Sequence, residues 1–215
     1  MCLIGFIALL DPPKPSAKLA IQGLVKKGVM VKVLTGDNET VTKYVCDMVG
    51  IESNTILLGS DIINMSDEEL KSKVMDVNIF AKLSPDQKAR IITAIKSNKH
   101  IVGFMGDGIN DAPALTLSDV GISMGIMGSQ ATIESSDVVI ADDNLKRIPD
   151  LIKISKRTKK IVLENIIFAG VTKLTFLILG ALGITGMLLA VFADVGVTLL
   201  AILNSLRVLT YKIKN

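Results

Sequence analysis

The sequence contains very little cysteine and histidine, and this limits the kinds of site that it can hold. Cys2 and Cys46 are the two cysteines, they lie far apart without a CxxC pattern, and His100 is the single histidine. A disulfide framework, or a soluble zinc site built from Cys and His, needs more of these residues at closer spacing. Both are therefore excluded, and we expect His100 to be a structural loop residue.

Positive charge is also in small excess. The chain has 24 Lys and Arg against 21 Asp and Glu, a net charge of +3, which is too small to indicate a nucleic-acid partner. The excess is concentrated in residues 146–160, where Asp150 is the single acid, and an apolar segment follows. Lys and Arg beside a membrane span mark its cytoplasmic side, although a solvated helix face is an alternative.

Charged residues become scarce after residue 160. Residues 166–182 and 187–209 each approach the 20 or so apolar residues that cross a bilayer, and only residues 183–186 separate them. So short a link predicts an antiparallel hairpin of two transmembrane helices, preceded by a basic juxtamembrane helix at 151–165 and followed by a cytoplasmic tail at 210–215. A buried helical hairpin of a soluble protein is the alternative.

Residues 1–150 mix charges of both signs, as a soluble domain does. No basic region precedes the apolar start, so we expect a buried strand at residues 2–10 and no cleavable signal peptide. Strands alternating with helices predict an α/β domain with one parallel sheet. The expected strands are residues 29–35, 79–81, 101–105, 120–123 and 138–141, and the expected helices are residues 40–49, 85–96 and 112–118.

The string GDGIND at residues 106–111 follows one of these strands, at the edge of a parallel sheet where ligands bind. Gly106 and Gly108 let the backbone turn tightly and approach a phosphate. Asp107 and Asp111 offer the hard oxygen ligands that magnesium prefers, and Asp107 is the better candidate for direct binding. A simple turn rich in Asp and Gly is the alternative.

Two further strings carry polar groups at the same kind of position. In TGDN, residues 35–38, the Thr35 hydroxyl and the Gly36 amide are suited to hold the oxygens of a transferring phosphoryl group. In LSPDQK, residues 83–88, Ser84 is a good helix N-cap and Lys88 lies in the first turn, within reach of an anion at the sheet edge. Taken alone, Lys88 also fits a solvated surface residue.

Taken in order, these three strings resemble motifs of the haloacid dehalogenase superfamily, and the wording of TGDN and GDGIND resembles the phosphorylation domain of P-type ATPases. The resemblance implies a Rossmann-type parallel sheet, Mg2+ and ATP as cofactors, and a part in pumping a metal cation across a lipid bilayer. It also implies a multi-pass protein of the plasma membrane with its phosphorylation domain in the cytoplasm. The residues that it assigns to catalysis are Thr35, Gly36, Asp37, Lys88, Asn110 and Asp111, with Asp107 and Asp111 binding magnesium.

One departure from the family matters most: the chain contains no Asp-Lys-Thr-Gly-Thr string. In the family, the aspartate of that string is the nucleophile that becomes phosphorylated. The nucleotide-binding domain and the earlier membrane helices are also missing. We therefore expect a C-terminal part of a pump that is inactive alone and has the missing N-terminal part as its partner.

The resemblance points to two different cations. Residues 5–114, with strings such as VKVLTGDNETVTKY, look like the magnesium-transporting branch, whereas the stretch from residue 124 onward looks like the zinc, cadmium and lead exporters. Lys173 and Asp194 are costly inside a bilayer, and a mutual salt bridge is the economical reason for their presence. The exporter resemblance implies that Asp194 binds the transported ion and that Lys173 is its counter-charge. The alternative for Lys173 is that it extends to the membrane interface.

Specificity should follow the membrane residues, so zinc or cadmium export is the leading hypothesis. The alternatives are a fragment of a magnesium-transporting pump, or a catalytically dead regulatory half that pairs with another pump chain. A phosphatase with a membrane anchor is a third possibility, which the absent nucleophile disfavours.

Overall fold

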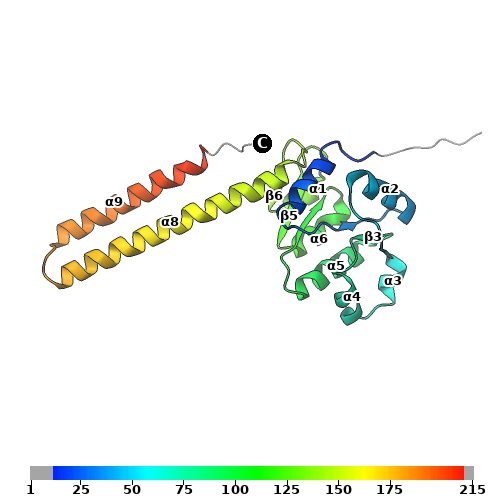
Figure 1. Ribbon diagram of the computed structural model, residues 1–215, viewed down its shortest axis with the longest axis horizontal. Helices are drawn as coiled ribbons and strands as arrows, with labels where there is room; N and C mark the ends of the chain where they lie inside the picture. The colour runs from blue at the N-terminus through cyan, green and yellow to red at the C-terminus, as the bar shows by residue number, and fades with distance from the viewer. Residues whose placement is uncertain (1–11, 211–215) are drawn as a thin grey trace, which may run out of the picture. The chain divides into compact units, whose positions relative to one another are not determined.

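The computed structural model describes residues 12–210. The strand expected at residues 2–10, and residues 211–215 of the tail expected at 210–215, lie outside the described residues. The chain divides into two compact units, one up to Arg147 and the other from Ile148. Figure 1 shows the helices and strands of both units and labels most of them.

Within its described residues, the first unit alternates short strands with helices. Its strands are β1 (Val33–Leu34), β2 (Ile56–Leu58), β3 (Ile79–Ala81), β4 (Gly103–Gly106), β5 (Val120–Met124) and β6 (Val138–Ile140). Its helices are α1 (Ala17–Val25), α2 (Glu39–Val49), α3 (Gly59–Ile63), α4 (Asp67–Lys73), α5 (Pro85–Ser97), α6 (Ala112–Leu117) and α7 (Gln130–Glu134), with a 3-10 helix at Ile109–Asp111.

The strands form two parallel sheets of three strands each, which corrects the expectation of one sheet. In the first sheet β3 lies between β1 and β2, and in the second β5 lies between β4 and β6. Val33 and Leu34 of β1 are in register with Ile79 and Phe80 of β3. The alternation of strands and helices predicts parallel strands, but it does not encode whether β1 and β4 pair with each other.

Strand β3 forms the centre of the unit. Ile79, Phe80 and Ala81 have no exposed surface, and Ile62 of α3 and Leu70 of α4 are equally buried. A strand covered on both faces is typical of parallel sheets with crossover helices. This rigid layer supports the loops that follow the strands.

A second apolar cluster joins the two sheets. Its buried members are Ile92 of α5, Ala114 of α6 and Val102, which precedes β4. Leu34 of β1 and Phe104 of β4 both pack against this cluster. The end of β1 and the middle of β4 therefore contact the same group of side chains. The TGDN string begins directly after Leu34, and the GDGIND string begins at Gly106, the last residue of β4.

The second unit contains α8 (Arg147–Ala181), α9 (Met187–Ser205) and a 3-10 helix at Leu206–Val208. The segments expected as separate helices at 151–165 and 166–182 form one continuous helix. Residues 150–169, which include the expected boundary, contain neither glycine nor proline, and Pro149 lies in the first turn, where proline is tolerated. Among the described residues, α8 is the one helix long and apolar enough to cross a membrane, judged by length and composition.

Helices α8 and α9 form a hairpin, with Gly183 at a φ of 72° in the turn between them. Asn165 of α8 donates from Nδ2 to the Ala201 carbonyl and to the Ser205 hydroxyl of α9. Asn204 donates to Asn165 Oδ1 at 2.8 Å. These bonds link residues 36 to 40 positions apart and hold the two helices antiparallel (Figure 1).

Candidate functional site

The loop after β4 is folded tightly over a buried carboxylate. A Cβ added at Gly106 would lie 2.5 Å from the Cβ of Asp111, which is closer than real side-chain atoms approach. The Gly108 amide faces Asp111 Oδ2 at 3.4 Å. Glycine at position 106 is therefore required by the close approach of Asp111 to the backbone.

Lys88 reaches this loop from helix α5. Its Nζ lies 2.7 Å from Asp111 Oδ1, and the two side chains are only 14% and 12% exposed. Helix α5 begins where the sequence predicts, because the Ser84 hydroxyl accepts from the Gln87 amide and the Gln87 side chain accepts from the Ser84 amide. This capping box sets the first turn of the helix, and with it the position of Lys88.

The TGDN loop is tied to the chain just before α5. Leu83 donates its amide to the Thr35 carbonyl at 3.0 Å, and Lys82 donates to the Asp37 carbonyl at 2.8 Å. Within the loop, the Thr35 hydroxyl accepts from the Asp37 amide and donates to Asp37 Oδ2. The backbone that carries Thr35, Gly36 and Asp37 is thus held beside the segment that leads to Lys88.

The contacts therefore connect the three strings in order: TGDN to the start of α5, and Lys88 of α5 to Asp111 of GDGIND. Asp107 and Asn110 are exposed at the same loop. Among the described residues, no hydrogen bond or ion pair joins the Asp107 or Asn110 side chain to Thr35 or Lys88.

The donor set suits magnesium held together with phosphate oxygens. In the described part of the chain, no group of three or more His, Cys, Asp or Glu side chains could hold a metal ion by itself. Magnesium commonly binds through one or two carboxylates and completes its shell with phosphate oxygens and water. Asp107 is exposed and fits that role, whereas Asp111 already accepts from Lys88.

A second charged pair lies in the α8/α9 hairpin. Lys173 Nζ of α8 is 2.9 Å from Asp194 Oδ1 of α9, and the side chains are 65% and 56% exposed. They line a shallow pocket whose other walls include Phe176 and Val197. Opposite charges in direct contact, on a hairpin otherwise dominated by apolar side chains, reduce the cost of placing either one there.

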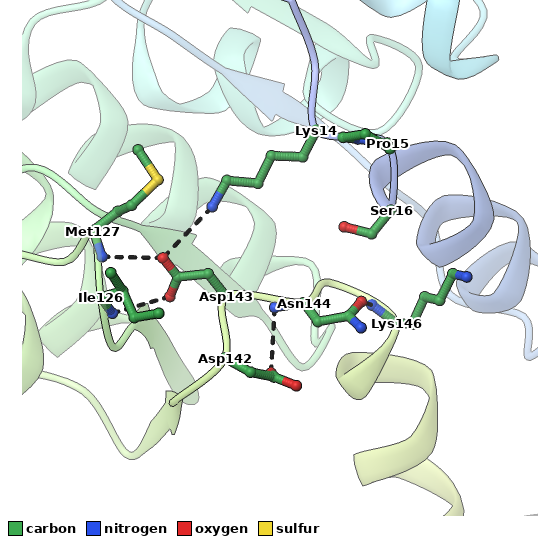
Figure 2. A pocket seen from close by; sticks show the side chains of 9 residues that line it. All are labelled: Lys14, Pro15, Ser16, Ile126, Met127, Asp142, Asp143, Asn144 and Lys146. Carbon is green, nitrogen blue, oxygen red and sulfur yellow. Dashed lines mark hydrogen bonds and ion pairs between the residues drawn. The ribbon is translucent and has the colours of Figure 1, made fainter.

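Sequence reasoning missed a third cluster, which surrounds Asp143 in the loop after β6 (Figure 2). Asp143 has a φ of 51°, and its two carboxylate oxygens accept from the amides of Ile126 and Met127. Lys14 Nζ lies 3.7 Å from Asp143 Oδ2. The available signal was the string ADDN at residues 141–144, because Asp and Asn are the non-glycine residues that best tolerate a positive φ.

Burial and the neighbouring donors shift the pKa of Asp143 in opposite directions. Desolvation raises the pKa of the Asp143 carboxyl, but the amides of Ile126 and Met127, the Lys14 ammonium and the Gly125 amide outweigh it, so the pKa lies below its usual value. Asp143 is therefore a carboxylate at neutral pH.

The chain is similar in sequence to known proteins. The family model of haloacid dehalogenase-like hydrolases matches residues 2–119. The magnesium-transporting ATPase, P-type 1, of Escherichia coli K12 is 42% identical over 158 residues, covering 74% of this chain and 18% of that protein. The zinc-transporting ATPase of Synechocystis is 37% identical over 207 residues, covering 95% of this chain and 25% of that protein.

A solved structure is similar over both units. The crystal structure of a zinc-transporting PIB-type ATPase in the E2.Pi state gives a TM-score of 0.76 at 30% identity, covering 93% of this chain and 28% of that one. The chain belongs to the haloacid dehalogenase-like hydrolases, and its relatives within them are P-type ATPases that transport magnesium, calcium or zinc. It spans about a quarter or less of the length of the relatives that it matches.

Proposed function

We propose that this chain supplies the phosphoryl-binding part of an ATP-driven metal-cation pump, and that the nucleophilic aspartate comes from the rest of the pump. The observation that carries the proposal is the largely buried Lys88–Asp111 pair, which links the first turn of α5 to the GDGIND loop. Backbone bonds join the segment just before α5 to the TGDN loop. This arrangement gathers anion-binding groups at one edge of parallel strands, where ligands bind in open α/β sheets.

Each residue has a distinct part in the proposed chemistry. The Gly36 amide and the Thr35 hydroxyl donate to phosphoryl oxygens, and the Lys88 ammonium balances their negative charge. Asp107 holds magnesium, which when bound neutralises further phosphoryl charge. Asn110 and Asp111 orient the phosphate and the attacking water. The Asp37 amide holds the Thr35 oxygen, and the Thr35 proton turns from Asp37 Oδ2 to the phosphoryl group when that group binds.

The edges of β1 and β4 offer a place for the strand that would carry the nucleophile. In the described residues each strand has one hydrogen-bonded neighbour, β3 for β1 and β5 for β4. Leu34 and Phe104 pack on the same apolar cluster, and Met105 of β4 is 40% exposed although parallel strands are usually covered. A parallel strand added between them would end beside both Thr35 and Asp107.

The test is to assemble the chain with the N-terminal part of its pump and to measure the phosphoenzyme formed from radiolabelled ATP. We expect Lys88→Met to lower it at least about tenfold, since one charge-assisted contact to the phosphoryl group is worth about 1.5–3 kcal/mol. Lys96→Met is the matched control, because Lys96 lies on the same helix and pairs with Asp119. Equal phosphoenzyme levels in the two variants would contradict the proposal. We also expect that this chain alone, without the rest of the pump, hydrolyses no ATP.

For the transported ion, we propose zinc or cadmium. The Lys173–Asp194 contact supports this choice, because it places a carboxylate that can bind a divalent cation beside an ammonium that can replace the departing ion. The zinc-transporting relative is also similar over 95% of the chain, against 74% for the magnesium-transporting one. Magnesium would then be a cofactor at Asp107 and not the cargo.

Transport assays on the assembled pump test this choice. Asp194→Ala should abolish zinc- and cadmium-stimulated phosphate release, and Lys173→Ala should allow binding but slow ion release. Thr175→Val is the control, because Thr175 donates within α8 to the Val171 carbonyl and does not line the pocket of Lys173 and Asp194. A pump stimulated by magnesium as cargo, or unaffected by Asp194→Ala, would refute the assignment.

We also propose that α8 and α9 both cross the bilayer, with residues 183–186 outside the cell and the basic residues 156–160 in the cytoplasm. A cysteine introduced at Thr185 should react with a membrane-impermeant reagent added from outside. Labelling of this cysteine from the cytoplasmic side alone would contradict the proposed topology.

A further inference from the structure

The loop between β5 and α7 touches the proposed magnesium site at one backbone bond. The Ser129 amide donates to the carbonyl of Asp107 at 3.0 Å, and Ser129 is also the N-cap of α7, where its hydroxyl accepts from the Thr132 amide. The carbonyl of Asp107 belongs to the peptide unit that precedes Gly108. Its bond to Ser129 therefore restricts the backbone rotation that aims the Asp107 side chain.

The same loop is held from its other side by Asp143. The Ile126 amide donates to Asp143 Oδ1 at 3.1 Å and the Met127 amide donates to Oδ2 at 3.0 Å, so one carboxylate spans two successive residues (Figure 2). Lys14, from the segment before α1, approaches Oδ2 at 3.7 Å. Hydrogen bonds to a charged acceptor are stronger than those between neutral groups.

Two glycines show that the loop has little freedom between these anchors. A Cβ at Gly125 would lie 2.8 Å from the Ala141 Cα, and a Cβ at Gly128 would overlap the Met124 carbonyl oxygen. The Gly125 amide also donates to the Ile140 carbonyl at 2.9 Å. A loop packed this closely transmits a displacement at one end to the other instead of absorbing it.

We infer that Asp143 is a positioning residue for the phosphorylation site, because it clamps the 125–129 loop and that loop fixes the backbone of Asp107. The inference rests on the proposed role of Asp107. It gives Asp143 a function at the magnesium site through the 125–129 loop, without a direct contact between Asp143 and Asp107 among the described residues. Lys14 contributes less, because its Nζ lies 3.7 Å from Asp143 Oδ2, which is too long for a hydrogen bond.

Three variants of the full chain in detergent micelles separate a positioning role from simple stabilisation. Asp143→Asn and Asp143→Gly both tolerate the positive φ of this position, yet Asn cannot accept both amides through charged oxygens and Gly accepts neither. Asp119→Asn is the matched control, because Asp119 also accepts a backbone amide, that of Val102, and pairs with a lysine, Lys96, but at the opposite end of β4.

The first readout is hydrogen exchange at the Ser129 amide, which lies away from the substituted side chain. We expect exchange at least about tenfold faster in both Asp143 variants and unchanged in Asp119→Asn. Equal Ser129 exchange in all three variants would overturn the inference, whatever their melting temperatures.

The second readout is the affinity for Mn2+, a paramagnetic substitute for magnesium, titrated by electron paramagnetic resonance. The Asp143 variants should bind Mn2+ about threefold to tenfold more weakly than Asp119→Asn, near the lower limit for residues that orient a metal ligand. Faster Ser129 exchange with unchanged Mn2+ affinity would overturn the positioning of Asp107. If the unsubstituted chain binds no Mn2+ at all, the metal role proposed for Asp107 fails, while Ser129 exchange still decides whether Asp143 clamps the loop.

Discussion

Replacing Gly106 by alanine is the sharpest test of the geometry at the GDGIND loop. The added Cβ would lie 2.5 Å from the Cβ of Asp111 and 2.7 Å from its Cγ and Oδ2, where ordinary contact begins at 3.4 Å. Something must therefore move by about 0.9 Å, the difference between 3.4 and 2.5 Å. Asp111 is buried, so it has little room to move without leaving its partners.

The expected consequence follows from the length of the Lys88–Asp111 contact. It measures 2.7 Å, and lengthening it by the required shift gives about 3.6 Å, which is beyond hydrogen-bond range. Forcing an extra methyl group into a packed site costs typically about 1–3 kcal/mol. We expect Gly106→Ala to lower the free energy of unfolding by about that amount and to weaken Mn2+ binding.

Gly103→Ala provides the matched control on the same strand. A Cβ at Gly103 has the Val120 carbonyl oxygen as its nearest neighbour, at 3.8 Å, which is ordinary contact. Urea unfolding and Mn2+ titration of both variants make the comparison. If Gly106→Ala and Gly103→Ala lose the same stability and bind Mn2+ equally well, the close approach of Asp111 to the β4 loop is not a feature of the protein in solution.

Three further outcomes are expected. Ser84→Ala should lower the free energy of unfolding by about 1 kcal/mol in urea titrations, whereas Ser16→Ala, at a helix start without a side-chain cap, should change it little. The Val102 amide, and then Lys96, hold the pKa of Asp119 below its usual value, so the Asp119 carboxylate stabilises the fold above about pH 4. This stabilisation should disappear as the pH falls through the lowered pKa. Acid unfolding of Asp119→Asn should therefore lack this pH-dependent loss of stability. Asn165→Leu should weaken the α8/α9 hairpin by about 1 kcal/mol in SDS-titrated micelles, and Thr172→Val, which loses a bond within one helix, should not.

Local signals predicted much of the first unit. Helix α5 starts at the proline that follows Ser84, and β3 occupies residues 79–81 as expected, because N-caps, first-turn prolines and short β-branched or aromatic runs are encoded by adjacent residues. The positions of TGDN and GDGIND at the carboxyl ends of strands were predictable for the same reason. The Lys173–Asp194 contact was expected from the cost of two isolated charges in an apolar hairpin.

Features that depend on distant residues were not predictable. Strand β2 and helices α3 and α4 are short, and they form because Ile62 and Leu70 are buried against β3 while Arg90 of α5 donates to the carbonyls of Ile62 and Met65. The division into two sheets depends on which strands find neighbours. The Asp143 clamp joins residues 16 and 17 positions apart through backbone amides, which leave no trace in the identities of Ile126 and Met127.

The Lys88–Asp111 pair also explains why Asp107 and Asp111, two carboxylates in one loop, can have different roles. Asp111 accepts from Lys88 through one oxygen and from the Gly108 amide through the other, and its side chain is 12% exposed. To bind a cation, Asp111 would have to lose its contact with Lys88 in a largely desolvated environment, which is costly. Asp107 is exposed and has no such commitment among the described contacts. A phosphoryl group arriving near Lys88 would share its ammonium with Asp111, and the added negative charge would then favour a cation at Asp107. Anion and cation binding at this edge should therefore strengthen each other, and inorganic phosphate should raise the Mn2+ affinity of the unsubstituted chain more than that of Lys88→Met.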